Sequence, residues 1–211
     1  MTSKTIKVVK GLPIDKATQE IAERIYKMTR SYVVVGIPSS KTERKQDDKP
    51  KRKKSNKQGD ENVNNASLAY LHENGSPADR IPPRQFMKPG INMMKGIIPR
   101  VLSNGIRREL DGYKGATIEA MNAVGRTAAE AIQDYIMDGS HLAPLADSTI
   151  RRRAEDRENS TFHANKSLYE QMRQSGASRR EAQAAAGYKP LIDTGSLVGS
   201  ITYGIRKDGE D

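Results

Sequence analysis

The chain of 211 residues has no cysteine and no tryptophan, and only two phenylalanines. Without cysteine, disulfides, thiol-based active sites and zinc sites with cysteine ligands are excluded. No uninterrupted apolar run approaches the ~18 residues of a membrane-spanning helix, so we expect no membrane contact. The first 13 residues lack the apolar run of a signal peptide, and we expect synthesis in the cytoplasm. The eight tyrosines and eight methionines must supply much of the bulky packing in the core.

Acidic residues are outnumbered, and the formal net charge is +10. Residues 41–57 hold nine lysines and arginines against three acidic residues, so this run carries +6 of that charge. The surrounding residues show no apolar periodicity, and we interpret residues 39–64 as a flexible, disordered basic loop. The alternative is a nucleic-acid-binding protein that uses this loop together with Arg151, Arg152 and Arg153. Neither basic run lies near an aromatic platform or a known reading motif.

Apolar spacing predicts helices at three places in the first two thirds of the chain. One helix carries Ile14, Ala17, Ile21, Ile25 and Met28 on one face and ends near residue 30. A short helix is expected at residues 66–73, and residues 90–137 are predicted to be mainly helical. Within the last segment, Pro99 either starts a helix or kinks it.

The clearest helix follows a break between Gly112 and Gly115. Its apolar residues repeat at alternating spacings of three and four: Ile118, Met121, Gly125, Ala128, Ile132 and Tyr135. The small residues Gly125 and Ala128 would let another element approach closely. Gly139 is expected to end this helix.

Strand patterns are fewer and shorter. Residues 32–37 form a β-branched run before Pro38, which predicts a strand buried on both faces. Residues 197–206 alternate, which predicts a half-buried strand. With an extended segment at residues 80–87, these give an α+β fold: a small antiparallel or mixed sheet packed against a long helix. We expect the helices at residues 118–135 and 14–28 to cover one face of the sheet.

The whole chain, residues 1–211, is expected to form a single domain. Gly139 is followed by an apolar segment at residues 142–145 that packs back, and Asp147 or Ser148 caps a short basic helix. Residues 158–188 are interpreted as a helical insertion. Its helices are expected around Leu168 and Met172 and over residues 179–186.

Residues 65–91 are the least generic stretch, and their order resembles a family of tailed-bacteriophage proteins. These are the minor tail, neck or tail-completion proteins, also called virion morphogenesis proteins. The residues that carry the resemblance are Ala69, His72, Glu73, Gly75, Ile81, Pro82, Arg84, Phe86 and Pro89. Residues 33–38, 143–145 and 190–201 resemble further pieces of the same family, in the same order. The likeness spans residues 14–206 with divergent inserts.

The resemblance implies a structural virion protein and not an enzyme, with no cofactor. Its expected place is the head–tail junction or the top of the tail tube, in the neck or tail of a virion assembled in a bacterial host. Its expected partners are further copies in a homo-oligomeric ring and the neighbouring tail tube, terminator or connector proteins. For the basic loop, contact with packaged DNA is a further expectation to be tested.

The sequence offers candidate residues for two other kinds of site, a metal site and an aspartic-protease site. His72, His141 and His163 lie in unrelated segments without a chelating spacing, so we expect no metal site and a backbone partner for His72. Asp193, Thr194 and Gly195 follow an apolar run as in aspartic proteases, which use two such carboxylates. This chain has one such motif, and only 16 residues follow Gly195. We therefore predict a tight turn in which Asp193 accepts backbone N–H bonds and Gly195 has a positive φ.

Overall fold

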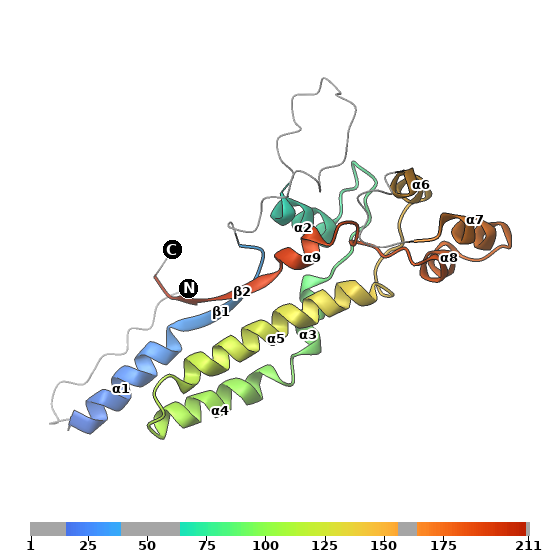
Figure 1. Ribbon diagram of the computed structural model, residues 1–211. Coiled ribbons are helices and arrows are strands. Elements are labelled where there is room, and N and C mark those ends of the chain that lie inside the picture. Colours follow the sequence, from blue (N-terminus) through green and yellow to red (C-terminus); the bar gives the residue numbers. More distant parts are fainter. Residues whose placement is uncertain (1–15, 39–63, 156–163, 210–211) are drawn as a thin grey trace.

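The computed structural model describes residues 16–38, 64–155 and 164–209. The fold is α+β, as predicted: within these ranges nine helices accompany one two-stranded antiparallel sheet (Figure 1). The elements are α1 (Lys16–Thr29), β1 (Ser31–Gly36), α2 (Asn65–Asn74), α3 (Met87–Met93), α4 (Ile98–Leu110), α5 (Ala116–Asp138), α6 (Asp147–Glu155), α7 (Lys166–Gln174), α8 (Arg179–Ala186), α9 (Ser196–Ser200) and β2 (Thr202–Lys207). The predicted basic loop lies outside the described residues except for Asn64, which caps α2.

Helix α5 is the central element and forms where the sequence predicted it, although Ile118 of the predicted apolar face is 55% exposed. Gly115 and Gly139 flank it, both in the left-handed conformation that favours glycine. Helices α3 and α4 and both strands pack against it. Glu109 of α4 accepts a hydrogen bond from the backbone N–H of Thr117, at 3.1 Å, and so satisfies a free donor at the start of α5.

Glycines let three elements approach α5 closely. A Cβ at Gly105 of α4 would overlap the Cβ of Ala120, and one at Gly90 of α3 would lie 2.7 Å from the Cα of Ile132. On α5 itself, a Cβ at Gly125 would overlap the ring of Tyr203 from β2. The predicted close approach at Gly125 is therefore confirmed, and a strand makes it.

The sheet is smaller than predicted, because residues 80–87 form no strand in the structure. Ile81 pairs only as an isolated bridge with Ser76, and the next two residues are prolines, which have no N–H to donate to a ladder. The backbone N–H groups of Arg84 and Phe86 bond to α2 instead. The chain then turns into α3 at Met87.

The two strands differ from the prediction in burial and in length. Strand β1 alternates instead of being buried on both faces, and Tyr32 and Val34 are exposed on the side away from α5. The predicted strand at residues 197–206 is helical in its first half, α9, where the Ser200 hydroxyl donates to the Leu197 carbonyl. Gln133 of α5 donates to the Val198 and Ile201 carbonyls and holds this helix-to-strand change in place.

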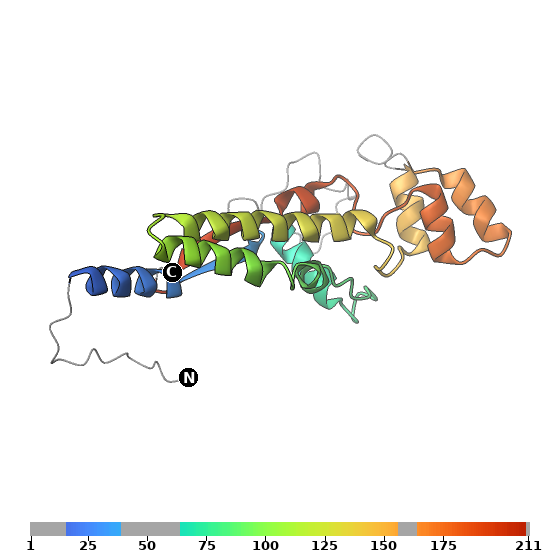
Figure 2. The same cartoon turned by 90° about the horizontal axis from the view of Figure 1, so that it is seen from below.

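Helix α1 forms at the predicted residues but does not cover the sheet. It runs on from β1 and projects past the end of the α4–α5 pair (Figures 1 and 2). Pro99 occupies the first turn of α4, where its missing N–H costs nothing, so it starts a helix rather than kinking one. Residues 90–137 are thus three helices and not one long helix.

Two separate clusters of buried apolar side chains make up the core. The larger one lies between α5, the sheet, α2, α3 and α9 and includes Phe86 and Ile132. The smaller one lies among α6, α7 and α8, which we call the three-helix module, and includes Leu145, Ile150 and Tyr169. Helices α7 and α8 confirm the helices expected around Leu168 and Met172 and over residues 179–186.

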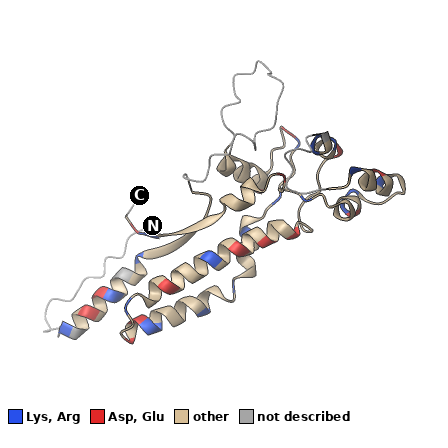
Figure 3. Ribbon diagram, in the orientation of Figure 1, with Lys and Arg blue, Asp and Glu red and all other residues tan. Residues whose placement is uncertain are grey.

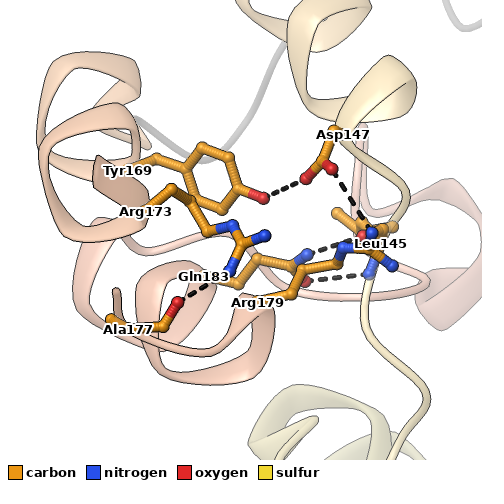
Figure 4. A network of polar contacts seen from close by, with 7 residues as sticks. All are labelled: Leu145, Asp147, Tyr169, Arg173, Ala177, Arg179 and Gln183. Carbon is orange, nitrogen blue, oxygen red and sulfur yellow. Dashed lines mark hydrogen bonds and ion pairs between the residues drawn. The ribbon is translucent and has the colours of Figure 1, made fainter. Parts of the chain in front are cut away.

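A polar network ties the three-helix module together (Figure 4). The side-chain amide of Gln183 exchanges two hydrogen bonds, at 2.7 and 2.8 Å, with the backbone of Leu145. Asp147 accepts a hydrogen bond from the Tyr169 hydroxyl and pairs with Arg179 at 3.3 Å. The hydrogen bond from Tyr169, helped by the charge of Arg179, lowers the pKa of Asp147 below its usual value.

Candidate functional site

The residues that carry the family resemblance meet at one place, where α2, α3 and the segments around residues 84 and 143 come together. We call this place the junction and define it by His72, Glu73, Arg84, Phe86 and Arg153. It is built mainly from helix ends and loops, and its charged side chains bond to the backbone groups that these segments leave unpaired.

Glu73 lies near the end of α2 and caps the start of α3. Its Oε2 accepts hydrogen bonds from the backbone N–H groups of Phe86, at 2.8 Å, and Met87, at 3.1 Å. These donors have no partner within the helix, and a carboxylate is also favoured by the dipole at a helix N-terminus. Glu73 thereby fixes the position of the fully buried Phe86 ring.

Arg84 binds the segment that follows α5. Its Nε donates to the Ala143 carbonyl at 2.8 Å and its NH2 to the Pro144 carbonyl at 3.0 Å. Its own backbone N–H donates to the His72 carbonyl at 2.6 Å. Burial, followed by the nearby charge of Arg153, lowers the pKa of Arg84. A guanidinium bound to two carbonyls in this way acts as a structural joint between segments that are far apart in sequence.

His72 is mostly buried beside two positive charges. Burial, then the charges of Arg84 and Arg153, lowers its pKa to about 4. Its Nδ1 is buried and has no hydrogen-bond partner, so the expected backbone partner is absent at that atom. His72 is therefore neutral at physiological pH and packs as a polar but uncharged ring.

Arg153 belongs to the basic run that the nucleic-acid alternative would use, but its guanidinium points into the protein. Its NH1 donates to the carbonyls of Ile192, at 2.6 Å, and Lys189, at 3.2 Å. Its Nε lies 3.5 Å from Asp193 Oδ1 as an ion pair without hydrogen-bond geometry. Arg151 and Arg152 are exposed. The three neighbouring arginines therefore divide into one structural residue and two surface residues.

The turn at residues 193–195 differs from the prediction in one respect. Gly195 has the predicted positive φ, 80°. The hydrogen bond from the Ser196 N–H, at 3.3 Å, is accepted by the Thr194 hydroxyl and not by Asp193. The Asp193 carboxylate instead pairs with Arg153. A protease dyad requires two carboxylates that share a proton, and the partner found here is a guanidinium.

The two described histidines lie in different environments. His141 pairs with Asp138 at 3.0 Å and stacks on Tyr135, whereas His72 is in the junction. His163 lies outside the described residues. Across the part of the chain that the structure describes, no three His, Asp or Glu side chains are grouped closely enough to hold a metal ion. None of the described helices is long and apolar enough to cross a membrane.

Basic and acidic residues are interspersed along α1, α4 and α5 (Figure 3). In the three-helix module, Arg173 and Arg180 donate to the carbonyls of Ala177 and Ser140. Several arginines are thus used within the fold. The basic run at residues 41–57 lies outside the described residues, so the DNA-contact expectation stays a prediction.

The resemblance to a family selected all of the junction residues except Arg153. It did not predict the hydrogen bonds and packing contacts that these side chains make. The pairing of Glu73 with the start of α3 joins residues 13 and 14 positions apart, so no local helix-start signal in the sequence points to it. The roles of Arg153 and Gln183 depend on segments brought together only by the fold. Comparisons with protein-family models, curated proteins and solved structures find no match to this chain.

Proposed function

We propose that this chain is a structural virion protein of a tailed phage, placed at the head–tail junction or the top of the tail tube. It assembles there as a homo-oligomeric ring that completes the tail or joins it to the head. The neighbours in this proposal are tail tube, terminator or connector proteins. No catalytic step is part of the proposal.

One observation carries this proposal: the residues that resemble the phage family are structural joints. Glu73 caps α3, Arg84 holds the carbonyls of residues 143 and 144, and Phe86 fills the core. A sequence pattern whose side chains build a shape is what a structural subunit needs. These contacts use the functional groups of the motif for packing, which leaves it without an evident reactive group.

The distribution of exposed apolar side chains also supports an assembling protein. Many of the large ones lie at the end formed by α1 and the turn between α4 and α5 (Figure 1). They are Ile21, Ile25, Tyr26, Ile106, Leu110, Tyr113 and Ile118. Apolar side chains gathered in this way on a surface mark protein-interaction sites.

The test is the position of the protein in virions. Purified particles decorated with antibody to this chain are imaged by negative stain, with pre-immune antibody as the control. Label is expected where the head of the virion meets the tail. Label on the capsid surface, at the distal tail tip, or nowhere on the particle would contradict the proposal. The nucleic-acid alternative instead predicts DNA binding whose affinity falls steeply with salt.

A further inference from the structure

Helix α1 has an apolar face that the rest of the described chain leaves mostly uncovered. Ile21 and Ile25 lie on this face and are 45% and 44% exposed. Met28 shares the face, and its sulfur accepts a hydrogen bond from the Thr117 hydroxyl at 3.0 Å. The last turn of α1 is therefore anchored on α5, and α1 also contacts α4, but Ile21 and Ile25 in the preceding turns remain exposed.

The sheet also has an outer face with two exposed apolar side chains, beside which Thr202 and Arg206 of β2 lie. Side chains alternate across a strand, so Val33 and Val35 point toward α5 while Tyr32 and Val34 point away. Tyr32 and Val34 are 43% and 40% exposed. Opposite Val34 stands Gly204, whose missing side chain leaves open space beside it.

The connection between α1 and β1 prevents the helix from covering this face of its own sheet. Arg30 is the only residue between Thr29 of α1 and Ser31 of β1. A helix can fold back over a strand only through a loop that reverses the chain. Here α1 continues along the line of β1 and away from the body (Figures 1 and 2).

From these two surfaces we infer that α1 of one copy packs on the outer face of the β1–β2 sheet of a second copy. The sizes match: 14 helical residues span about 21 Å, and six strand residues span about 20 Å. A helix layer on a sheet layer is a standard way to bury both apolar faces. A second copy is the occupant because this chain carries both surfaces and cannot join them within itself.

The contact is heterologous when the copy that receives α1 gives its own α1 to a third copy, whereas a reciprocal exchange between two copies closes a two-fold dimer. Heterologous contacts close into rings when the rotation between neighbours allows it and otherwise form open filaments. The inference deepens the proposed function, because a ring of identical subunits needs one contact of this type. It assigns that contact to Ile21 and Ile25 on one side and Tyr32 and Val34 on the other.

The absence of cysteine makes a crosslinking test direct. Two full-length single-cysteine variants, Ile25→Cys and Val34→Cys, are mixed and treated with a short bismaleimide. A crosslinked dimer that contains one copy of each variant is expected in the mixture, and little crosslinking is expected in either variant alone. Glu23→Cys, on an exposed position of the polar face of α1, is the matched control and should give no such dimer with Val34→Cys.

Arginine substitutions give a second readout in solution. Ile25→Arg or Val34→Arg should shift the chain toward monomer in sedimentation velocity while leaving the circular dichroism spectrum unchanged, whereas Glu23→Arg should assemble normally. The inference is wrong if wild type stays monomeric at every concentration, or if like variants crosslink to each other instead. A different result separates the contact from the oligomer. If wild type forms oligomers, but the cysteine variants do not crosslink and the arginine variants do not dissociate, the oligomer uses another contact and this inference is wrong. The antibody experiment on virions tests the proposed function separately.

Discussion

At the scale of single residues, the junction holds a neutral histidine between positive charges. Because the pKa of His72 falls from 6.5 in the unfolded chain to about 4 in the fold, the unfolded chain binds more protons between these values. The contribution of His72 to the free energy of unfolding is therefore highest above pH 6.5 and falls as the pH drops toward 4. From the two pKa values, the loss between pH 7 and pH 5 is about 2 kcal/mol.

Urea unfolding of wild type and His72→Gln at pH 7 and pH 5 measures this effect. The wild type should lose about 2 kcal/mol more than the variant over this range. The difference between the two proteins removes pH effects that do not involve His72. Equal losses in both proteins would show that His72 is protonated in the fold without cost.

The carboxylate of Glu73 gives a second prediction at this scale. Glu73→Ala removes the Oε2 atom that accepts from both the Phe86 and Met87 N–H groups and should lower the free energy of unfolding by about 2 kcal/mol. Glu73→Gln keeps one oxygen acceptor and should cost less. Glu130→Ala, at an exposed position of α5, is the control and should change little. If the alanine and glutamine variants unfold at the same urea concentration, the cap contributes no more than its charge.

At the scale of elements, α5 and β2 meet through a glycine. Gly125→Ala would add a methyl group that overlaps the Tyr203 ring, and the strain should cost about 1–3 kcal/mol even though alanine favours a helix. Thermal unfolding followed by circular dichroism measures the loss. Gly199→Ala in α9 is the control, because a Cβ there meets nothing within 4 Å, and it should be neutral or stabilising.

A double variant separates steric strain from other effects. Tyr203→Ala removes the ring that a new methyl group would strike, so adding Gly125→Ala to it should cost far less than in the wild type. The Tyr203 hydroxyl also bonds to Asn122 at 3.3 Å, and that loss belongs to both Tyr203 backgrounds. Additive losses would mean that the strand shifts away and the close approach is not required.

The sequence correctly predicted elements whose apolar residues repeat at regular spacings. The prediction was wrong for segments whose secondary structure depends on contacts with residues elsewhere in the chain. The α5 pattern was sufficient to place the helix, although its residues face two layers: Ala120 and Ile132 lie against α4 and α3, and Gly125 lies against β2. Residues 80–87 look extended, but the prolines and the bonds from Arg84 and Phe86 to α2 prevent pairing in a sheet. Residues 197–200 alternate weakly, and their helical form depends on Gly195 and on Gln133 from a distant helix.

The same distinction holds for the site. Likeness to a family selected Glu73, Arg84 and Phe86, but spacing alone could not show that a glutamate caps a helix 14 residues further on. Arg153 looked like part of a basic surface run because sequence does not reveal which of three arginines faces inward. The pairing of Arg153 with the Ile192 carbonyl joins residues 39 positions apart.

At the scale of the whole molecule, the two clusters of buried side chains predict two units of stability. The smaller cluster draws on Leu145 and Ile150 as well as on α7 and α8, so the three-helix module is wider than the insertion expected at residues 158–188. Arg153 and Lys189 join the module to the body, the latter by donating to the Met137 carbonyl at 2.7 Å. A few hydrogen bonds of this kind couple two units less strongly than a shared apolar core does.

Tyr169→Ala tests this division. The Tyr169 side chain is 5% exposed, and its ring packs edge-on against Tyr188 with centroids 5.9 Å apart. Its hydroxyl donates a hydrogen bond to Asp147. Removal of the side chain should destabilise the module by about 3 kcal/mol. Native-state hydrogen exchange should then show faster exchange in α7 and α8 with unchanged protection in α5. Tyr70→Ala, at a 74% exposed position, is the control and should leave both regions as in wild type. If α5 loses protection to the same extent as the module, the molecule unfolds as one unit and the junction couples the two cores tightly.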